Sequence, residues 1–123
     1  MLGKSEIAAF VATKDATRSR EFYENKLGLT FVSDEPYAIV FDANGITLRI
    51  QKVHEVAPIP YTALGWHVTG IEAVIAKLVE RGVAFEIFER IPQDDLGIAT
   101  FPNGAKVAWF KDPDGNLLSL DEY

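Results

Sequence analysis

Apolar and polar positions alternate along this chain in an order that occurs twice. In the first half, residues 7–12 form an apolar run of strand length, and residues 16–27 carry apolar side chains at helical spacing. Asp15 is a suitable N-cap for this helix, and Gly28 predicts its end, because glycine readily takes the left-handed conformation that closes many helices. Three strands are predicted after it: residues 29–32, 37–41 and 46–51.

The same order of elements begins again in the second half. Residues 64–69 resemble a strand, and the apolar positions that start at Ile71 follow the i, i+3, i+4, i+7 and i+8 spacing of an amphipathic helix. Gly82 predicts the end of this helix. Three strands are again predicted after it: residues 84–88, 105–110 and 117–120. The polar segment 89–103 is expected to be a loop with a short strand near residues 98–101.

Two glycine turns support this repeat. Asn44-Gly45 in the first half and Asp114-Gly115 in the second each precede the last strand of their half. Both dipeptides favour the positive φ angles of tight hairpins, so we expect a hairpin at each place. A segment with two prolines, residues 54–61, is expected to link the two halves.

Composition limits this picture further. The 123 residues suit a single α+β domain, residues 1–123, whose two βαβββ modules cover about 1–57 and about 62–123. No apolar run approaches the roughly 18 residues of a membrane span, and cysteine is absent, so we expect a cytoplasmic protein with no membrane partner. The net charge of −6 argues against nucleic acid as a partner and favours cationic ligands.

Two motifs at the ends of the repeat resemble those of a known family. Residues 15–29 combine an acidic cap, a Phe-Tyr pair and a Leu-Gly ending, and residues 110–116 form an Asp-Pro-Asp-Gly-Asn hairpin before the last strand. With this separation the chain resembles the glyoxalase, bleomycin-resistance and extradiol-dioxygenase group, the vicinal oxygen chelate superfamily. The resemblance implies two βαβββ modules that form a cupped mixed sheet, a small-molecule ligand in the cup, and a homodimer that completes each pocket.

Catalytic members of that superfamily bind a divalent metal through one His, Gln or Glu from the first and last strands of each module. The matching positions in this chain are Ala8, Arg49, Ala63 and Ser119. None of the four is a ligand of the expected kind. We therefore predict no metal site and no cofactor. A makeshift site from His54, Glu55 and His67 would require the linker to fold inward.

Strand alternation and the supply of aromatic residues predict which side chains face a ligand. The expected ligand-binding residues are Phe10, Tyr37, Thr47, Arg49, Gln51, His67, Phe101, Trp109, Ser119 and Asp121. A buried Arg49 needs an anionic partner, which is either a protein carboxylate, Asp121 or Glu6, or a ligand carboxylate. If the protein catalyses a reaction, His67 and Arg49 are the candidate catalytic residues.

These patterns predict a metal-free small-molecule binding protein that resembles the bleomycin-resistance proteins. It would sequester an aromatic or cationic ligand in the cavity of the cupped sheet. The alternative is a glyoxalase-like lyase or isomerase, or a dioxygenase-related enzyme, with a diverged active site. A third class, a structural module, would fill its pocket with its own side chains. The sequence contains no nucleophile elbow, phosphate-binding loop or dinucleotide fingerprint.

Overall fold

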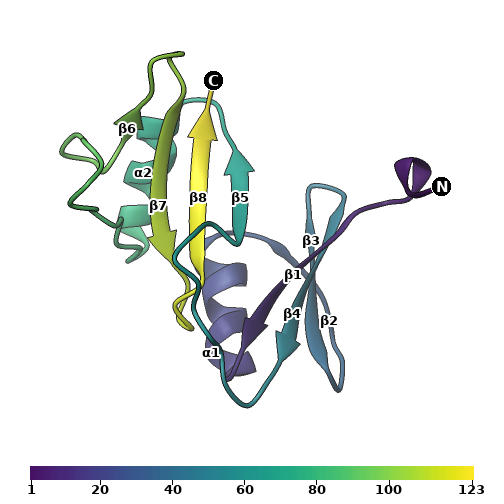
Figure 1. Ribbon diagram of the computed structural model, residues 1–123. Helices are drawn as coiled ribbons and strands as arrows, with labels where there is room; N and C mark the ends of the chain where they lie inside the picture. Colours follow the sequence, from purple (N-terminus) through teal and green to yellow (C-terminus); the bar gives the residue numbers. More distant parts are fainter. The chain divides into compact units, whose positions relative to one another are not determined.

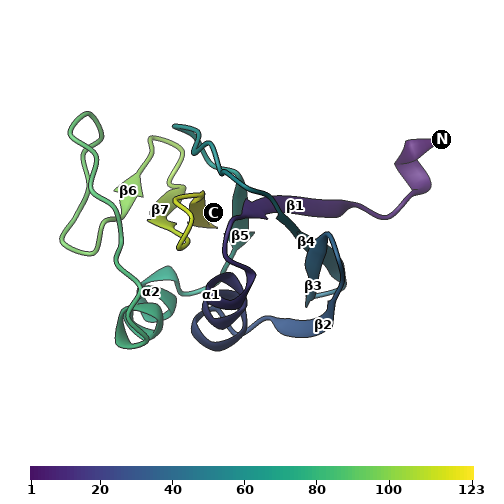
Figure 2. The same ribbon diagram turned by 90° about the horizontal axis from the view of Figure 1, so that it is seen from below.

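The computed structural model describes residues 1–123, which divide into two compact units, residues 1–57 and residues 58–123 (Figure 1, Figure 2). Both contain a four-stranded mixed sheet and a helix, so the predicted α+β class is confirmed. None of the helices has the length and apolar character needed to cross a membrane.

The first unit has the predicted order of strand, helix and three strands. Its elements are η1 (Leu2–Lys4), β1 (Ala8–Thr13), α1 (Ala16–Glu21), η2 (Phe22–Lys26), β2 (Thr30–Asp34), β3 (Ala38–Ala43) and β4 (Ile46–Lys52). The sheet has the order β1-β4-β3-β2, in which β1 runs parallel to β4 and the other pairs are antiparallel. The first strand of the unit therefore pairs with its last strand.

The helix of the first unit begins as the sequence predicts and then widens. The Asp15 carboxylate accepts a hydrogen bond from the Arg18 backbone N–H at 3.1 Å, which caps α1. The following turn, η2, is π-helical, and both Phe22 and Tyr23 are buried there with their rings edge to face at 5.3 Å. Gly28 follows with a φ of 77° and ends the helical segment.

The second unit repeats this topology. Its elements are β5 (Leu64–His67), α2 (Ile71–Glu80), β6 (Ala99–Thr100), β7 (Lys106–Lys111) and β8 (Leu117–Glu122). The sheet order is β5-β8-β7-β6, with β5 parallel to β8. Figures 1 and 2 show α2 along one face of this sheet. That helix buries Ile71, Ile75 and Leu78, and β8 buries Leu118 and Leu120.

The prediction of a strand over residues 84–88 is wrong. The segment makes only an isolated bridge from Phe85 to Phe110, and the fourth strand of the sheet is β6, inside the predicted range 98–101. A side chain explains the difference. The Gln93 amide accepts a hydrogen bond from the Phe88 backbone N–H at 2.7 Å and donates one to the Glu86 carbonyl at 3.0 Å. It thus occupies backbone groups that a ladder would need.

The two hairpins are present but differ in form. Asn44 and Gly45 both have positive φ angles, 51° and 89°, as a two-residue hairpin turn between β3 and β4 requires. The second hairpin is a longer loop over residues 112–116. The buried Asp112 carboxylate organises it by accepting hydrogen bonds from the Asn116 backbone N–H at 3.0 Å and side-chain amide at 2.8 Å.

The N-terminus of α2 is capped by a residue from the end of the chain. Glu122 on β8 accepts hydrogen bonds from the backbone N–H groups of Gly70 at 2.6 Å and Ile71 at 3.2 Å. These two donors hold the pKa of the Glu122 carboxyl below its ordinary value. The carboxylate therefore couples the folding of α2 to that of the last strand.

We expect Glu122→Gln to lower the melting temperature by a few degrees at pH 7, because the amide loses the charge that the helix N-terminus favours. Since folding lowers the pKa, this contribution is fully present above the ordinary value of 4.5 and is lost as pH falls through the lowered value. Thermal melts should therefore show the two proteins converging in acid. Glu80→Gln, at the other end of α2, is the control, and an equal loss of stability in it would contradict the capping role.

Candidate functional site

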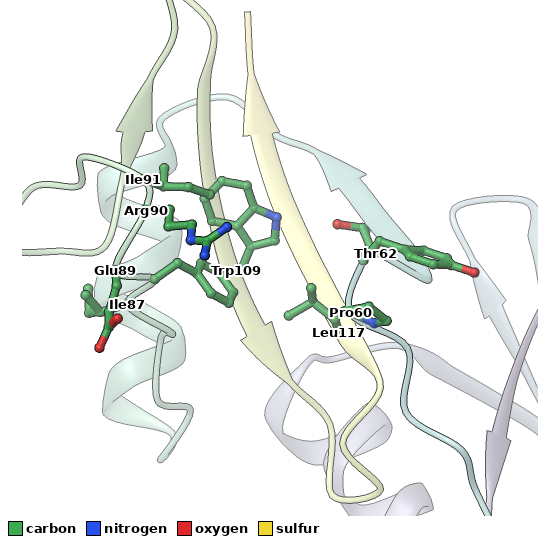
Figure 3. Close-up of a pocket in the computed structure, with 10 residues that line it drawn as sticks. Pro60, Thr62, Ile87, Glu89, Arg90, Ile91, Trp109 and Leu117 are labelled. Atoms are coloured by element: carbon green, nitrogen blue, oxygen red, sulfur yellow. The ribbon is translucent and has the colours of Figure 1, made fainter.

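A pocket of about 620 Å³ lies on the sheet of the second unit (Figure 3). Strands β7 and β8 supply its floor, and two loop segments supply its walls. The lining residues are Pro60, Tyr61, Thr62, Ile87, Phe88, Glu89, Arg90, Ile91, Trp109 and Leu117. Most of the lining is apolar, which is typical of sites for small organic ligands.

The floor of the pocket follows from the alternation of β7. Phe110 faces the core, where it is fully buried and stacks on Trp66 with a ring separation of 6.3 Å. Trp109 therefore faces the opposite side, into the pocket. The Phe88 ring meets it edge to face at 5.5 Å. Together, Trp109 and Phe88 form an aromatic surface on which a planar ring can stack.

Side-chain hydrogen bonds hold one wall of the pocket, residues 87–91. Besides its bonds to Phe88 and Glu86, the Gln93 amide donates to the Gly97 carbonyl at 2.8 Å. The Asp94 carboxylate accepts from the Ile98 backbone N–H at 2.9 Å. The wall is therefore fixed in shape, although its residues lie outside the strands of the sheet.

The other wall, residues 60–62, comes directly before β5. The Ala63 backbone N–H donates to the Leu117 carbonyl at 2.8 Å, which holds the end of this segment against β8. Pro58 packs on the hairpin loop so closely that a Cβ atom at Gly115 would lie 3.3 Å from the Pro58 Cγ. One end of this wall is thus held to β8 by a backbone hydrogen bond, and the other lies against the hairpin loop.

Two charged residues line the pocket, and they point in different directions. Figure 3 shows the Arg90 guanidinium extending over the pocket toward Trp109, whereas the Glu89 carboxylate turns away. Arg90 forms no ion pair and no hydrogen bond in the structure. The neighbouring Glu86 carboxylate is instead 3.5 Å from the Lys111 ammonium. The pocket therefore presents one unpaired cation beside an aromatic surface.

Of the ten predicted ligand-binding residues, Trp109 is the one that lines this pocket. Ser119 lies beside Trp109 on the neighbouring strand, with Gly65 on its other side. Two pairs further along β8, His67 Nδ1 is 2.7 Å from the Asp121 carboxylate, as their shared face predicts. Phe101 lies elsewhere. It lines a separate pocket together with Pro102, Asn103, Ala105, Val107 and Tyr123.

The remaining predicted residues belong to the first unit. Phe10, Thr47, Arg49 and Gln51 share one face of its sheet, because Phe10 pairs with Arg49 in the β1–β4 register. Tyr37 precedes β3 and is 80% exposed. The role of these side chains in ligand binding stays a prediction.

Arg49 has a protein partner, but a different one from those expected. Its guanidinium donates to the Glu35 carboxylate at 3.0 Å, rather than to Asp121 or Glu6, and the Ser33 hydroxyl donates to the other Glu35 oxygen at 3.0 Å. Hydrogen bonds from Arg49 and Ser33 hold the pKa of the Glu35 carboxyl below its ordinary value. Glu35 follows the edge strand β2, so its proximity to Arg49 depends on the bulged β2–β3 register.

The positions that hold a metal in catalytic relatives do not fit a metal here. Gly65 pairs with Ser119 as Phe10 pairs with Arg49, so the two last-strand positions are structurally equivalent. A guanidinium bound to Glu35 and a single hydroxyl occupy them. No three His, Cys, Asp or Glu side chains of the chain are grouped in a way that could hold a metal ion.

Sequence reasoning missed most of the pocket. Tyr61, Ile87, Phe88 and Arg90 lie in segments expected to be a linker, a strand and a polar loop. A signal was available in the predicted strand and the polar loop. Ile87 and Phe88 are large apolar residues at the end of the predicted strand, Ile91 is another within the loop, and such side chains need a surface to cover.

The βαβββ order of elements in each unit is typical of a known class of protein. The chain belongs to the Glyoxalase/Bleomycin resistance protein/Dioxygenase superfamily, whose family model matches residues 6–120. No curated protein matches the sequence closely.

Three solved structures illustrate the shared fold. A glyoxalase/bleomycin resistance protein/dioxygenase from Alicyclobacillus acidocaldarius has a TM-score of 0.74 at 19% identity, covering 98% of this chain and 92% of that one. The fosfomycin resistance protein FosX from Listeria monocytogenes has a TM-score of 0.77 at 14% identity, covering 98% and 93%. A lactoylglutathione lyase from Agrobacterium tumefaciens has a TM-score of 0.72 at 15% identity, covering 96% and 93%. At these identities the likeness concerns the fold.

The close contact between Gly65 and Ser119 gives a test of the sheet beside the pocket. A Cβ atom at position 65 would lie 2.7 Å from the Ser119 Oγ, well inside contact distance. We expect Gly65→Ala to lower the free energy of unfolding by about 1–3 kcal/mol, and Ser119→Ala to restore most of that loss. Urea unfolding of both single variants and the double variant measures the coupling. Strictly additive effects would contradict the predicted contact.

Proposed function

We propose that this protein binds a small planar aromatic molecule on Trp109 and does so without a metal. The single observation that carries the proposal is the pocket of about 620 Å³, whose lining includes the aromatic side chains of Trp109, Phe88 and Tyr61. A cavity of this size matches a ligand of a few fused rings. Such a ligand would displace water from the apolar lining, which favours binding. The pocket is open, so the protein's own side chains do not fill it.

The residues at the family's metal positions support the metal-free part of the proposal. Without a Lewis acid at those positions, the simplest role for the pocket is sequestration, as in the bleomycin-resistance proteins that the sequence resembles. The sequence led us to expect an aromatic or a cationic ligand, and of these two we propose the aromatic one. The negative net charge would favour a cationic ligand at long range, but the only charge directed over the pocket is that of Arg90.

The chain offers a direct optical test, because it has two tryptophans on opposite faces of one sheet. In a Trp66→Phe variant the emission reports on Trp109 alone. We expect a naphthalene probe such as 2-naphthol to change this emission saturably. The same probe should leave unchanged the emission of a Trp109→Phe variant, where only Trp66 remains.

Metal dependence is measured on the same signal. Dialysis against a chelator should leave the affinity for the probe unchanged, and metal analysis of the purified protein should find less than stoichiometric Fe, Ni, Zn or Mn. Equal responses from the two tryptophan variants would contradict binding at Trp109. A loss of binding on chelation would contradict the metal-free proposal.

A second candidate function, acid–base catalysis, is favoured by the pairing of His67 with Asp121. The Asp121 carboxylate accepts at the 2.7 Å contact when Nδ1 carries the hydrogen, and in that neutral tautomer Nε2 acts as the base. The Tyr123 ring stacks on the imidazole with a centroid separation of 5.3 Å. A histidine oriented in this way is what a lyase or isomerase that removes a proton next to a carbonyl would use.

Lactoylglutathione is a suitable probe for this second candidate, because one protein of similar fold is a lactoylglutathione lyase. If His67 acts as a base, the protein should exchange the α-proton of the lactoyl group for deuterium in heavy water, followed by NMR. His67→Gln should slow exchange about 100-fold or more, whereas the control His54→Gln should not. Absence of exchange with the wild-type protein would rule out this reaction.

We further propose that the protein is a cytoplasmic homodimer, as the family resemblance and the cysteine-free composition suggest. Light scattering of the purified chain measures its mass in solution, and fractionation of the source cells measures its location. A monomer at micromolar concentration would contradict the first of these expectations.

A further inference from the structure

We infer that the molecule bound on Trp109 is an aromatic carboxylate whose charge is neutralised by Arg90. The inference rests on the proposed function, because it assigns a chemical class to the ligand of the same pocket. It differs from the sequence-based expectation, which pointed to an aromatic or cationic ligand.

The state of Arg90 is the first observation behind this inference. Two other arginines form ion pairs: Arg20 lies 3.1 Å from Glu24, and Arg49 lies 3.0 Å from Glu35. Arg90 has no such partner, and its guanidinium extends over an apolar pocket. Its donors are therefore available to an incoming molecule.

The carboxylates nearest in sequence to Arg90 are directed elsewhere. Glu89 turns away from the pocket, Glu86 lies beside Lys111, and the Asp94 carboxylate accepts backbone hydrogen bonds from its own loop. None of these acids neutralises the guanidinium. A ligand anion would fill that role.

The two parts of the site select for one kind of molecule. The guanidinium presents paired N–H donors that match the two oxygens of a carboxylate. The Trp109 and Phe88 rings lie beside it and favour a flat apolar body. An aromatic cation would stack on the same rings but would be repelled by Arg90, and a neutral aromatic would leave the donors to water.

The negative charge of the whole protein does not overturn this selection. At physiological ionic strength the interaction between exposed charges is screened over about 8 Å, so the nearest charge dominates the field inside a small pocket. The net charge of −6 slows the approach of an anion, whereas Arg90 determines the affinity once the ligand is in place.

Order in the backbone of the wall adds to the affinity. Arg90 is three residues before Gln93. The Gln93 amide forms hydrogen bonds with the backbone of Glu86, Phe88 and Gly97. The guanidinium is thus carried on a loop whose backbone is already ordered, and binding needs to order only the Arg90 side chain. This lowers the entropy cost of binding compared with a free loop.

Three probes of nearly equal shape test the inference: 2-naphthoate, 2-naphthamide and 2-naphthylmethylammonium. In the Trp66→Phe protein, we expect 2-naphthoate to bind Trp109 about tenfold more tightly than the amide, and the cation to bind most weakly. Raising the salt concentration should weaken the binding of 2-naphthoate and leave that of the amide unchanged.

Variants at Arg90 complete the experiment. Arg90→Gln should reduce the affinity for 2-naphthoate about five- to tenfold without changing that for the amide, and Arg90→Lys should lie between. Lys77→Gln, which removes one exposed positive charge from α2, is the matched control and should have no effect.

The outcomes separate the inference from the proposed function. If the acid and the amide bind Trp109 equally well, or if Arg90→Gln keeps the preference for the acid, the inference fails and aromatic binding stands. If none of the three probes changes the Trp109 emission, both the inference and the proposed function fail.

Discussion

The parallel pairing of each unit's first strand with its last strand is the constraint on which the rest of the structure depends. In the second unit this pairing sets Gly65 against Ser119 and His67 against Asp121. It thereby determines which residues of β8 face α2 and which face outward. Since β7 follows the register of β8, the same pairing directs Trp109 away from the core. The pocket floor and the His67–Asp121 pair are consequences of one register.

The pocket itself arises where the second unit departs from the first. In the first unit, β2 runs beside β3 as a full strand, whereas the corresponding segment of the second unit, near Phe85, makes only one bridge. Gln93 replaces the missing ladder with side-chain hydrogen bonds and leaves residues 87–91 free to form a wall. A change in backbone pairing has therefore produced the surface on which we propose that the ligand binds.

Helices and strands with a regular pattern of apolar residues were predicted correctly from the sequence. The prediction was wrong where a side chain forms hydrogen bonds with backbone groups that a strand would need. The spacing from Ile71 onward predicted α2, and the glycines at 28 and 82 predicted the ends of the helical segments, because these signals are local. Residues 84–88 also have strand-like composition, but Gln93 lies five residues further on and no local pattern reveals its hydrogen bonds. Trp109 was predicted as part of an aromatic wall for a planar ligand, from the supply of aromatic residues. Arg90 was missed because the direction of a loop side chain depends on tertiary structure.

The central claim is that Trp109 and Arg90 together bind an aromatic acid, and a crystal structure of the complex with 2-naphthoate tests it most directly. We predict that the naphthalene ring lies against the Trp109 indole and that the carboxylate oxygens lie within about 3 Å of the Arg90 guanidinium nitrogens. A ring bound away from Trp109, or a carboxylate directed into solvent with Arg90 unengaged, would contradict the account.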